Sequence, residues 1–248
     1  MSFLQGIDIS KWQKEMDWAQ AEAGGAKYAF IRAGSISIYG VPYTDYQFDT
    51  NARIAPSFLP VGFYWYFRPQ FDPAAQAEYF CNLIKDKPWK LPPVLDLETT
   101  GGETKEEVTL ASKIFATEIY TRLNIWPLLY SRGLWLNAYT DTEDALWDFM
   151  DLWCARYKTP MDGPWGDGYC KPDSYDEWKF WQYTSSGDGA KYGAQSRSID
   201  MNYFNGDQAA FEEYIGDAPP PVYTFPPSIG VKVDIEGLKY RGHIEKDE

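Results

Sequence analysis

Two acidic residues, Asp96 and Glu98, stand at alternate positions at the end of a short apolar run and are followed by Thr-Thr-Gly-Gly. This pattern predicts a buried strand that delivers both side chains to its carboxyl end. Alternate strand residues share a face, so the two backbones would lie about 6.5 to 7 Å apart. Two carboxylates at that range suit cleavage of a glycosidic bond, because one can protonate the leaving oxygen while the other stabilises or attacks the cationic sugar. The alternative is that these acids cap the next helix or bind a cation.

Two further acids belong to predicted strands. Asp8 lies at the end of the first predicted strand, and Asp200 lies in the last. In a barrel of parallel strands the carboxyl ends converge on one face, where such folds do chemistry. We therefore expect Asp8, Asp96, Glu98 and Asp200 to share a cleft. Their mutual repulsion should raise the pKa of at least one of them, and we assign the retained proton to Glu98.

The order of the predicted elements indicates an irregular α/β barrel that resembles a TIM barrel. Strands are expected over residues 6–10, 28–33, 61–67, 92–98, 126–131, 152–157, 178–184 and 198–204, and helices over residues 12–23, 43–54, 73–85, 104–123, 132–150 and 207–214. Asp72 before a proline, and Thr104 three residues before a glutamate, give helix N-cap signals. Because no helix separates the last two strands, the end of the barrel is expected to be irregular.

The chain has 248 residues, 44% of them hydrophobic, which is enough for one full core. We expect a catalytic barrel over residues 1–217, a Pro-rich linker over 218–230 and a β-hairpin tail over 231–248. Val231, Val233 and Ile235 form an apolar stripe that an isolated hairpin cannot bury. The barrel, a second copy of the chain, a virion partner or a further domain would have to cover it.

Charge and composition exclude several function classes. The formal net charge is -13 with no basic block, which argues against nucleic acid and against an anionic membrane surface. The three cysteines are too few for a disulfide framework or a zinc cluster, and we expect free, buried thiols. The only histidine is His243. Hydrolases that need a histidine base or imidazole ligands for zinc are thus excluded from the barrel, and no metal or cofactor is expected.

Five segments resemble, in order, the strand signatures of glycoside hydrolase family 25, the lysozymes of the Chalaropsis type. They are GIDIS at 6–10, VLDLE at 94–98, LWCARY at 152–157, WQY at 181–183 and IDMNYF at 199–204. The resemblance extends over residues 6–214. It implies an irregular β/α barrel that hydrolyses the β-1,4 bond between N-acetylmuramic acid and N-acetylglucosamine in bacterial peptidoglycan, rather than chitin. It also implies that Glu98 is the general acid, that Asp96 is the nucleophile or supporting carboxylate, and that Asp8 and Asp200 position water, substrate and Glu98.

Aromatic residues make up 18% of the chain and recur on the predicted barrel strands, where they would stack on sugar rings or fill the core. We expect cleft positions for Tyr64, Tyr130 and Trp153, name Tyr66 as a further substrate contact, and expect Trp181 and Tyr183 to pack under the strands. Many members of the family have a histidine where this chain has Trp65, so the resemblance implies an altered sugar platform there.

Two polar residues have alternative roles. Arg32 would bind substrate or, as we favour, form an ion pair that keeps Asp8 or Asp96 ionised. Gln182 would hydrogen-bond an acetamido group of the substrate, or it would be a strand-end amide satisfied within the protein.

The stereochemical outcome is open at this stage. The backbone spacing of Asp96 and Glu98 is nearer that of inverting enzymes, but side chains can lean together by more than the difference between the classes. The resemblance favours retention, through an Asp96 intermediate or through the acetamido oxygen of the substrate. The alternative function is a non-catalytic glycan-binding or structural module of a phage particle, and the four intact acids argue against it.

The N-terminus lacks a basic segment followed by an apolar one, and no run of about 18 apolar residues is present to span a membrane. We expect a protein made in the cytoplasm without a signal peptide. It would act on the cell wall after release through a phage pore or from a virion.

Overall fold

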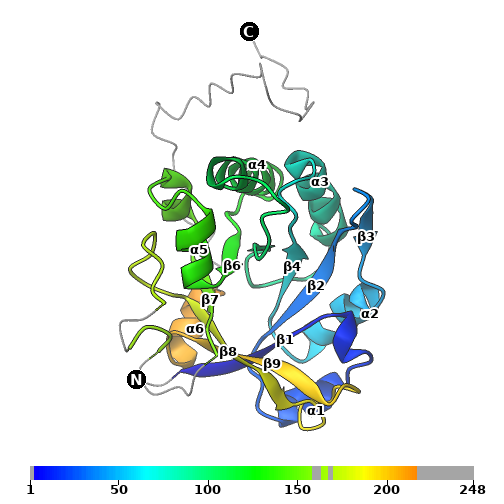
Figure 1. Cartoon of the computed structure of the whole chain (residues 1–248). Helices are drawn as coiled ribbons and strands as arrows, with labels where there is room; N and C mark the ends of the chain where they lie inside the picture. The colour runs from blue at the N-terminus through cyan, green and yellow to red at the C-terminus, as the bar shows by residue number, and fades with distance from the viewer. Residues whose placement is uncertain (1–2, 158–162, 167–169, 217–248) are drawn as a thin grey trace.

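The protein is described by a computed structural model over residues 3–157, 163–166 and 170–216. Its strands form one sheet in the order β1-β9-β8-β7-β6-β5-β4-β2-β3, and β1 also pairs with β2, which closes the sheet into a barrel (Figure 1). Strand β3 is attached outside this ring. The predicted irregular barrel is therefore confirmed. The predicted linker over 218–230 and the hairpin over 231–248 lie outside the described residues.

Apart from β3, which directly follows β2, the elements alternate between strand and helix until β7. The strands are β1 (Leu4–Ile9), β2 (Ala29–Ile36), β3 (Pro42–Thr44), β4 (Val61–Tyr66), β5 (Val94–Asp96), β6 (Leu128–Ser131), β7 (Leu152–Ala155), β8 (Phe180–Asp188) and β9 (Ser198–Phe204). The α-helices are α1 (Trp18–Ala23), α2 (Phe48–Ile54), α3 (Pro73–Ile84), α4 (Lys105–Leu123), α5 (Gly133–Tyr139) and α6 (Gln208–Tyr214). Short 3-10 helices are η1 (Lys11–Gln13), η2 (Ala55–Ser57) and η3 (Ala145–Phe149).

The irregular part of the barrel is strand β9. It pairs antiparallel with both β8 and β1, whereas the other neighbours within the ring are parallel. The first residues of β9 therefore lie at the same end of the barrel as the last residues of the parallel strands. This places Asp200 directly opposite Asp8 in the β1–β9 register. The direct return from β8 to β9 also explains why no helix lies between them.

Three predicted helices are shorter than expected. Residues 42–44 form β3 against the end of β2, so the helix predicted over 43–54 begins only at Phe48. The segments predicted as helices over 12–23 and 132–150 each contain an aspartate that starts a new helical segment. Asp17 caps α1 and Asp144 caps η3 through their side chains. Aspartate is favoured at N-caps over helix interiors, so these residues divide the predicted helices.

Helices α3 and α4 lie side by side on the outside of the barrel (Figure 1). Both predicted N-caps are present, at Asp72 and in the capping box that joins Thr104 to Glu107. Trp65 of β4 is fully buried on this outer side, where its indole N–H donates to Gln76 of α3. Alternation along β4 thus turns Trp65 away from the barrel interior. The prediction that Trp65 alters the sugar platform is wrong.

The barrel interior is filled by aromatic side chains. Phe30 of β2 stacks on Trp153 of β7 with ring centroids 4.4 Å apart. Tyr28 lies beside them and crosses β1 so closely that a Cβ at Gly6 would come within 2.4 Å of its ring. Only glycine fits at that crossing. This packed interior forms a solid floor beneath the carboxyl ends of the strands.

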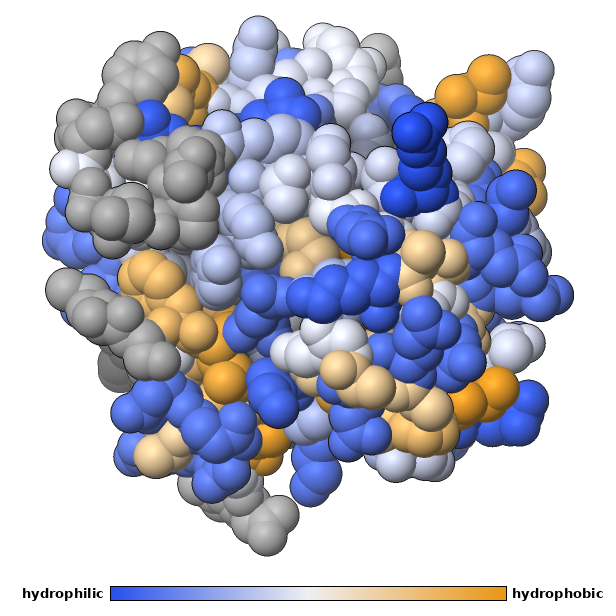
Figure 2. Space-filling model, turned by 90° about the horizontal axis from the view of Figure 1, so that it is seen from below, coloured by the Kyte–Doolittle hydropathy of each residue, from blue (hydrophilic) through white to orange (hydrophobic). Residues whose placement is uncertain are grey.

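No helix in the described ranges is long and apolar enough to cross a membrane. Figure 2 shows one face of the molecule, on which hydrophobic residues occur in small separate groups among hydrophilic ones. Scattered groups of this kind are ordinary on a protein surface. The three cysteines are free, as predicted; Cys81 and Cys154 are buried, and Cys170 is half-buried.

Candidate active site

A cavity of about 230 Å³ opens at the carboxyl end of the parallel strands. All ten residues predicted for the site line it, namely Asp8, Arg32, Tyr64, Tyr66, Asp96, Glu98, Tyr130, Trp153, Gln182 and Asp200. Four others were not predicted: Ser10, Trp12, Tyr157 and Ser185. Ser10 and Tyr157 are the last residues of two predicted strands, and Trp12 lies two residues after the first of them, so their position in the sequence could have identified them.

The pair Asp96 and Glu98 is held by a firmly anchored backbone. Asp96 is the last residue of β5, and its carbonyl accepts a hydrogen bond from the Phe67 N–H at 2.9 Å. The next residue, Leu97, donates its N–H to the Tyr130 carbonyl and accepts the Ser131 hydroxyl at 2.7 Å. The extended backbone therefore continues past the strand, and both carboxyls project into the cavity.

Asp96 and Glu98 line the same cavity, and each carboxyl influences the pKa of the other. Burial raises the pKa of Asp96 well above its usual range; the negative charge of Glu98 raises it further, while Arg32 opposes the rise. Burial also raises the pKa of Glu98, against the lowering effect of Arg132. The two carboxyls therefore titrate as a pair, and the pKa values of both are raised. The assignment of the retained proton to Glu98 stays a prediction.

Asp8 and Asp200 form a second carboxyl pair, because they lie directly opposite each other in the β1–β9 ladder and each influences the pKa of the other. Burial raises the pKa of Asp8 to about 6, with a smaller raising effect from Glu98. Burial raises the pKa of Asp200 to about 8, and the charges of Asp8 and Glu98 add to the rise. The two pairs are thus electrostatically linked through Glu98.

A chain of hydrogen bonds fixes Asp8. Its Oδ2 atom accepts from Gln182 Nε2 at 2.9 Å and from Asn202 Nδ2 at 2.8 Å. The acceptor oxygens of both amides are occupied, because Gln182 Oε1 accepts the hydroxyls of Tyr130 and Tyr157 and Asn202 Oδ1 accepts the indole N–H of Trp153. These partners orient both amide NH₂ groups toward Asp8.

This network makes Gln182 a strand-end amide that is satisfied within the protein, which was the second of its two predicted roles. Asn202 has the same function and was missed by sequence reasoning. The signal that could have found it is its position two residues after Asp200, on the same face of the last strand.

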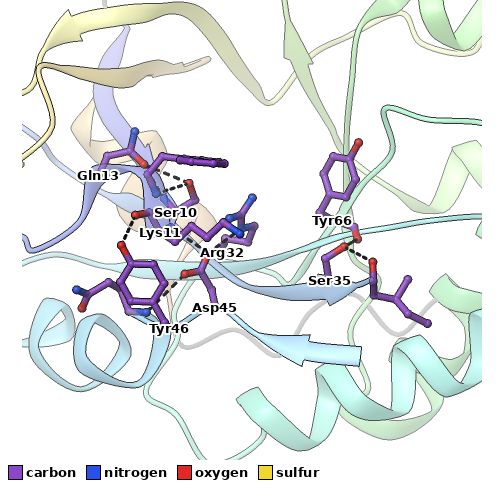
Figure 3. Close-up of polar contacts among 11 residues, drawn as sticks. Ser10, Lys11, Gln13, Arg32, Ser35, Asp45, Tyr46 and Tyr66 are labelled. Atoms are coloured by element: carbon purple, nitrogen blue, oxygen red, sulfur yellow. Dashed lines mark hydrogen bonds and ion pairs between the residues drawn. The ribbon is translucent and has the colours of Figure 1, made fainter. Parts of the chain in front are cut away.

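Arg32 forms a buried ion pair, as predicted, but the partner is Asp45 rather than Asp8 or Asp96. Arg32 Nε lies 2.8 Å from Asp45 Oδ2, which also accepts the backbone N–H of Lys11 at 2.9 Å (Figure 3). The hydroxyl of Tyr46 donates to the Lys11 carbonyl at 2.8 Å. Asp45 and Tyr46 therefore hold the turn after β1, which carries Ser10 and Trp12 into the cavity wall.

The aromatic residues named from the sequence fall into those that line the cavity and those that pack elsewhere. Tyr64 and Tyr130 line the cavity beside Trp153, which is 1% exposed and forms its floor. Tyr66 also lines the cavity, and its backbone carbonyl accepts the Ser35 hydroxyl at 2.7 Å (Figure 3). Trp181 and Tyr183 do not line the cavity, and Tyr183 stacks on Tyr203 of β9 at 4.4 Å.

The raised pKa values predict how stability depends on pH. Because the pKa of Asp8 rises from 3.8 to about 6, the folded state binds more protons than the unfolded state between those values. This contribution is complete below about pH 4 and is lost as pH rises through about 6, on the order of 3 kcal/mol for Asp8. Asp200 extends the loss to about pH 8. We therefore expect the thermal unfolding midpoint to fall by several degrees between about pH 5 and pH 8.

Thermal unfolding of Asp200→Asn at the same two pH values is the control. The variant lacks the titrating group on β9, so its midpoint should fall less than that of the wild type. An equal fall in both proteins would show that other groups cause the pH dependence.

The chain was compared with known families and structures. The sequence model of Glycosyl hydrolases family 25 matches residues 7–191. Lysozyme M1 of Streptomyces globisporus is 28% identical over 222 residues, which cover 84% of this chain and 70% of that protein. The N,O-diacetylmuramidase of Chalaropsis sp is 24% identical over 215 residues, covering 82% and 94%. The crystal structure of the bacterial lysozyme from Streptomyces coelicolor has a TM-score of 0.73 at 25% identity and covers 87% of this chain and 98% of that one.

The matched range contains Asp8, Asp96 and Glu98. Asp200 and Asn202 lie beyond it and enter the site through the pairing of β9 with β1.

Proposed function

This chain belongs to Glycosyl hydrolases family 25, and from this premise we propose how its four acids cleave the β-1,4 bond between N-acetylmuramic acid and N-acetylglucosamine in peptidoglycan. The protein is a lysozyme of that family, a peptidoglycan hydrolase. We assign the general acid to Glu98 and the nucleophilic or supporting carboxylate to Asp96. Asp8 and Asp200 position substrate, water and Glu98.

The observation that carries this proposal is that Asp96 and Glu98 line one cavity and that both have raised pKa values. A raised pKa lets a carboxyl of this pair retain its proton at a pH where an exposed carboxyl would have lost it. Glu98 delivers this proton to the glycosidic oxygen as the bond to the sugar breaks. Both carboxyls are then ionised, and Asp96 stabilises the positive charge that develops on the sugar.

The closeness of the two carboxyls, which shift each other's pKa values in one cavity, supports retention of the anomeric configuration. Inverting enzymes keep their carboxyls about 6.5 to 9.5 Å apart to leave room for a water molecule, whereas retaining enzymes bring them closer. The buried Asp96 Oδ1 atom accepts no hydrogen bond from a described protein donor. It can therefore attack the sugar directly, or accept the acetamido N–H so that the acetamido oxygen of the substrate attacks instead.

Asp8 acts through its position rather than as an acid. Gln182 and Asn202 hold its carboxyl in one orientation. Its charge raises the pKa of Asp96 and Asp200, which favours the protonated forms of its neighbours. Asp200 lies opposite Asp8 and interacts with Glu98, where it orients the attacking water in the second step.

Digestion of purified peptidoglycan and of chitin oligomers, each followed by borohydride reduction of the new ends, tests the bond that is cut. We expect muraminitol from peptidoglycan and slower cleavage of chitin, in the presence or absence of a chelator. Glucosaminitol alone, or faster cleavage of chitin, would contradict the bond assignment. Absence of turnover on both polymers would favour the glycan-binding module. The route to the cell wall through a phage pore or a virion stays a prediction.

A further inference from the structure

A second hollow of about 170 Å³ adjoins the catalytic cavity and is called here the side pocket. It is lined by Tyr66, Glu98, Ser131, Arg132 and Trp135. Tyr66 and Glu98 also line the catalytic cavity, so the side pocket continues the cleft on the Glu98 side. The residues predicted for the site from sequence did not include Ser131, Arg132 or Trp135.

The side pocket offers one uncommitted cation. Arg132 follows β6 and is exposed, and no hydrogen bond or ion pair joins its guanidinium to another described residue. By contrast, Arg32 in the catalytic cavity is held in an ion pair with Asp45 through its Nε atom. The Ser131 hydroxyl is also occupied, because it donates to the Leu97 carbonyl. Arg132 is therefore the group in this pocket that can donate several hydrogen bonds to a ligand.

The charges around the side pocket favour an anion. Burial raises the pKa of Glu98, and Arg132 opposes this rise, which shows that the guanidinium is within electrostatic reach of the catalytic acid. Arg68 lies with its guanidinium carbon 5.4 Å from the ring centroid of Tyr66 and adds a second positive charge on this side. The opposite side of the cleft carries Asp8 and Asp200. An anionic group on the substrate would be repelled there and attracted to the side pocket.

We propose that the side pocket binds a carboxylate carried by the glycan, with Arg132 donating hydrogen bonds to it and Trp135 packing against the attached sugar or peptide. A guanidinium matches a carboxylate through two parallel hydrogen bonds, which makes arginine suited to this recognition. Peptidoglycan presents carboxylates from two sources: the lactyl group where the stem peptide has been removed, and the stem peptide where it is present. The inference rests on the proposed function, because it places this ligand on the substrate that is cleaved.

Four substrates distinguish the two sources. Glycan oligomers with stem peptides are compared with oligomers from which an amidase has removed the peptides, and each is also prepared with its carboxyls converted to methylamides. We expect wild-type protein to favour at least one carboxylate form over its methylamide by about tenfold in kcat/KM, the usual effect of one charge-assisted hydrogen bond. A preference for the carboxylate over the methylamide that occurs only in the peptide-free oligomers identifies the lactyl carboxylate as the ligand. A preference that occurs only in the oligomers with stem peptides identifies a carboxylate of the stem peptide.

Arg132→Gln should abolish the preference for carboxylate over methylamide substrates, mainly through a change in KM. Arg132→Lys should retain part of this preference, because lysine keeps the positive charge but lacks the two parallel N–H donors of the planar guanidinium. The matched control is Arg122→Gln, which removes the same charge from α4, where Arg122 pairs with Glu78 and Glu118 away from the cleft. This control should keep the wild-type preference.

An equal preference in wild type and Arg132→Gln, or its loss in Arg122→Gln, would overturn the inference. Calorimetric Kd values for the same four ligands provide a second readout that does not need turnover. A protein that binds these ligands with the expected preference but cleaves none would contradict the proposed function and still support the side pocket.

Discussion

Replacement of Glu98 by glutamine should lower kcat on peptidoglycan by about a thousandfold, because the amide preserves the shape of the side chain but cannot deliver a proton. The residue lies at the junction of the catalytic cavity and the side pocket, so its loss affects the reacting bond directly. The charge of Glu98 raises the pKa of Asp96, and the variant should therefore leave Asp96 ionised at lower pH than in the wild type. Binding of glycan should persist, since the amide keeps both the size and the polarity of the acid.

The measurement is the rate of appearance of new reducing ends, together with calorimetric binding and circular dichroism to establish that the variant is folded. Glu106→Gln is the matched control, because Glu106 lies exposed in the first turn of α4. It should retain wild-type turnover. Wild-type turnover in Glu98→Gln itself would remove Glu98 from the role of general acid.

Replacement of Asp96 by asparagine should lower kcat by at least about a hundredfold. An amide cannot form a stable ester with the sugar and carries no charge to stabilise an oxocarbenium-like transition state. Asp96 is 5% exposed, and the positive charge of Arg32, which lowers the pKa of Asp96, would remain paired with Asp45 in the variant. The loss should appear in kcat more than in binding, since Asp96 acts chiefly on charge that develops during the reaction.

Added azide distinguishes the two retaining routes in this variant. If Asp96 attacks the sugar directly, azide should restore activity in Asp96→Asn and give a glycosyl azide of inverted configuration. If the acetamido oxygen of the substrate attacks, azide should have little effect. Asp86→Asn, at an exposed position after α3, is the control and should leave kcat unchanged. If kcat were nearly unchanged in Asp96→Asn, another carboxyl, such as Asp8, would have to take this role.

The local part of this protein could be predicted from sequence because the relevant signals act over a few residues. Alternation along β5 placed Asp96 and Glu98 on one face, and the caps at Asp72 and Thr104 marked the starts of α3 and α4. The absence of a helical pattern before Ser198 predicted the irregular return of the barrel. The family resemblance extended these local patterns to a cleft, and its ten predicted residues do line one cavity.

The tertiary structure decided which of these residues touch and which of their pKa values are raised. Asn202 holds Asp8 from 194 residues away, and no local pattern encodes that contact. The antiparallel direction of β9 sets Asp200 against Asp8, and the turn at Asp45 takes the ion pair of Arg32 away from the catalytic acids. The pKa values follow from burial and from the distances between carboxyls, both of which are properties of the closed barrel. Such contacts depend on strand register and burial, which are established only when distant segments pack together.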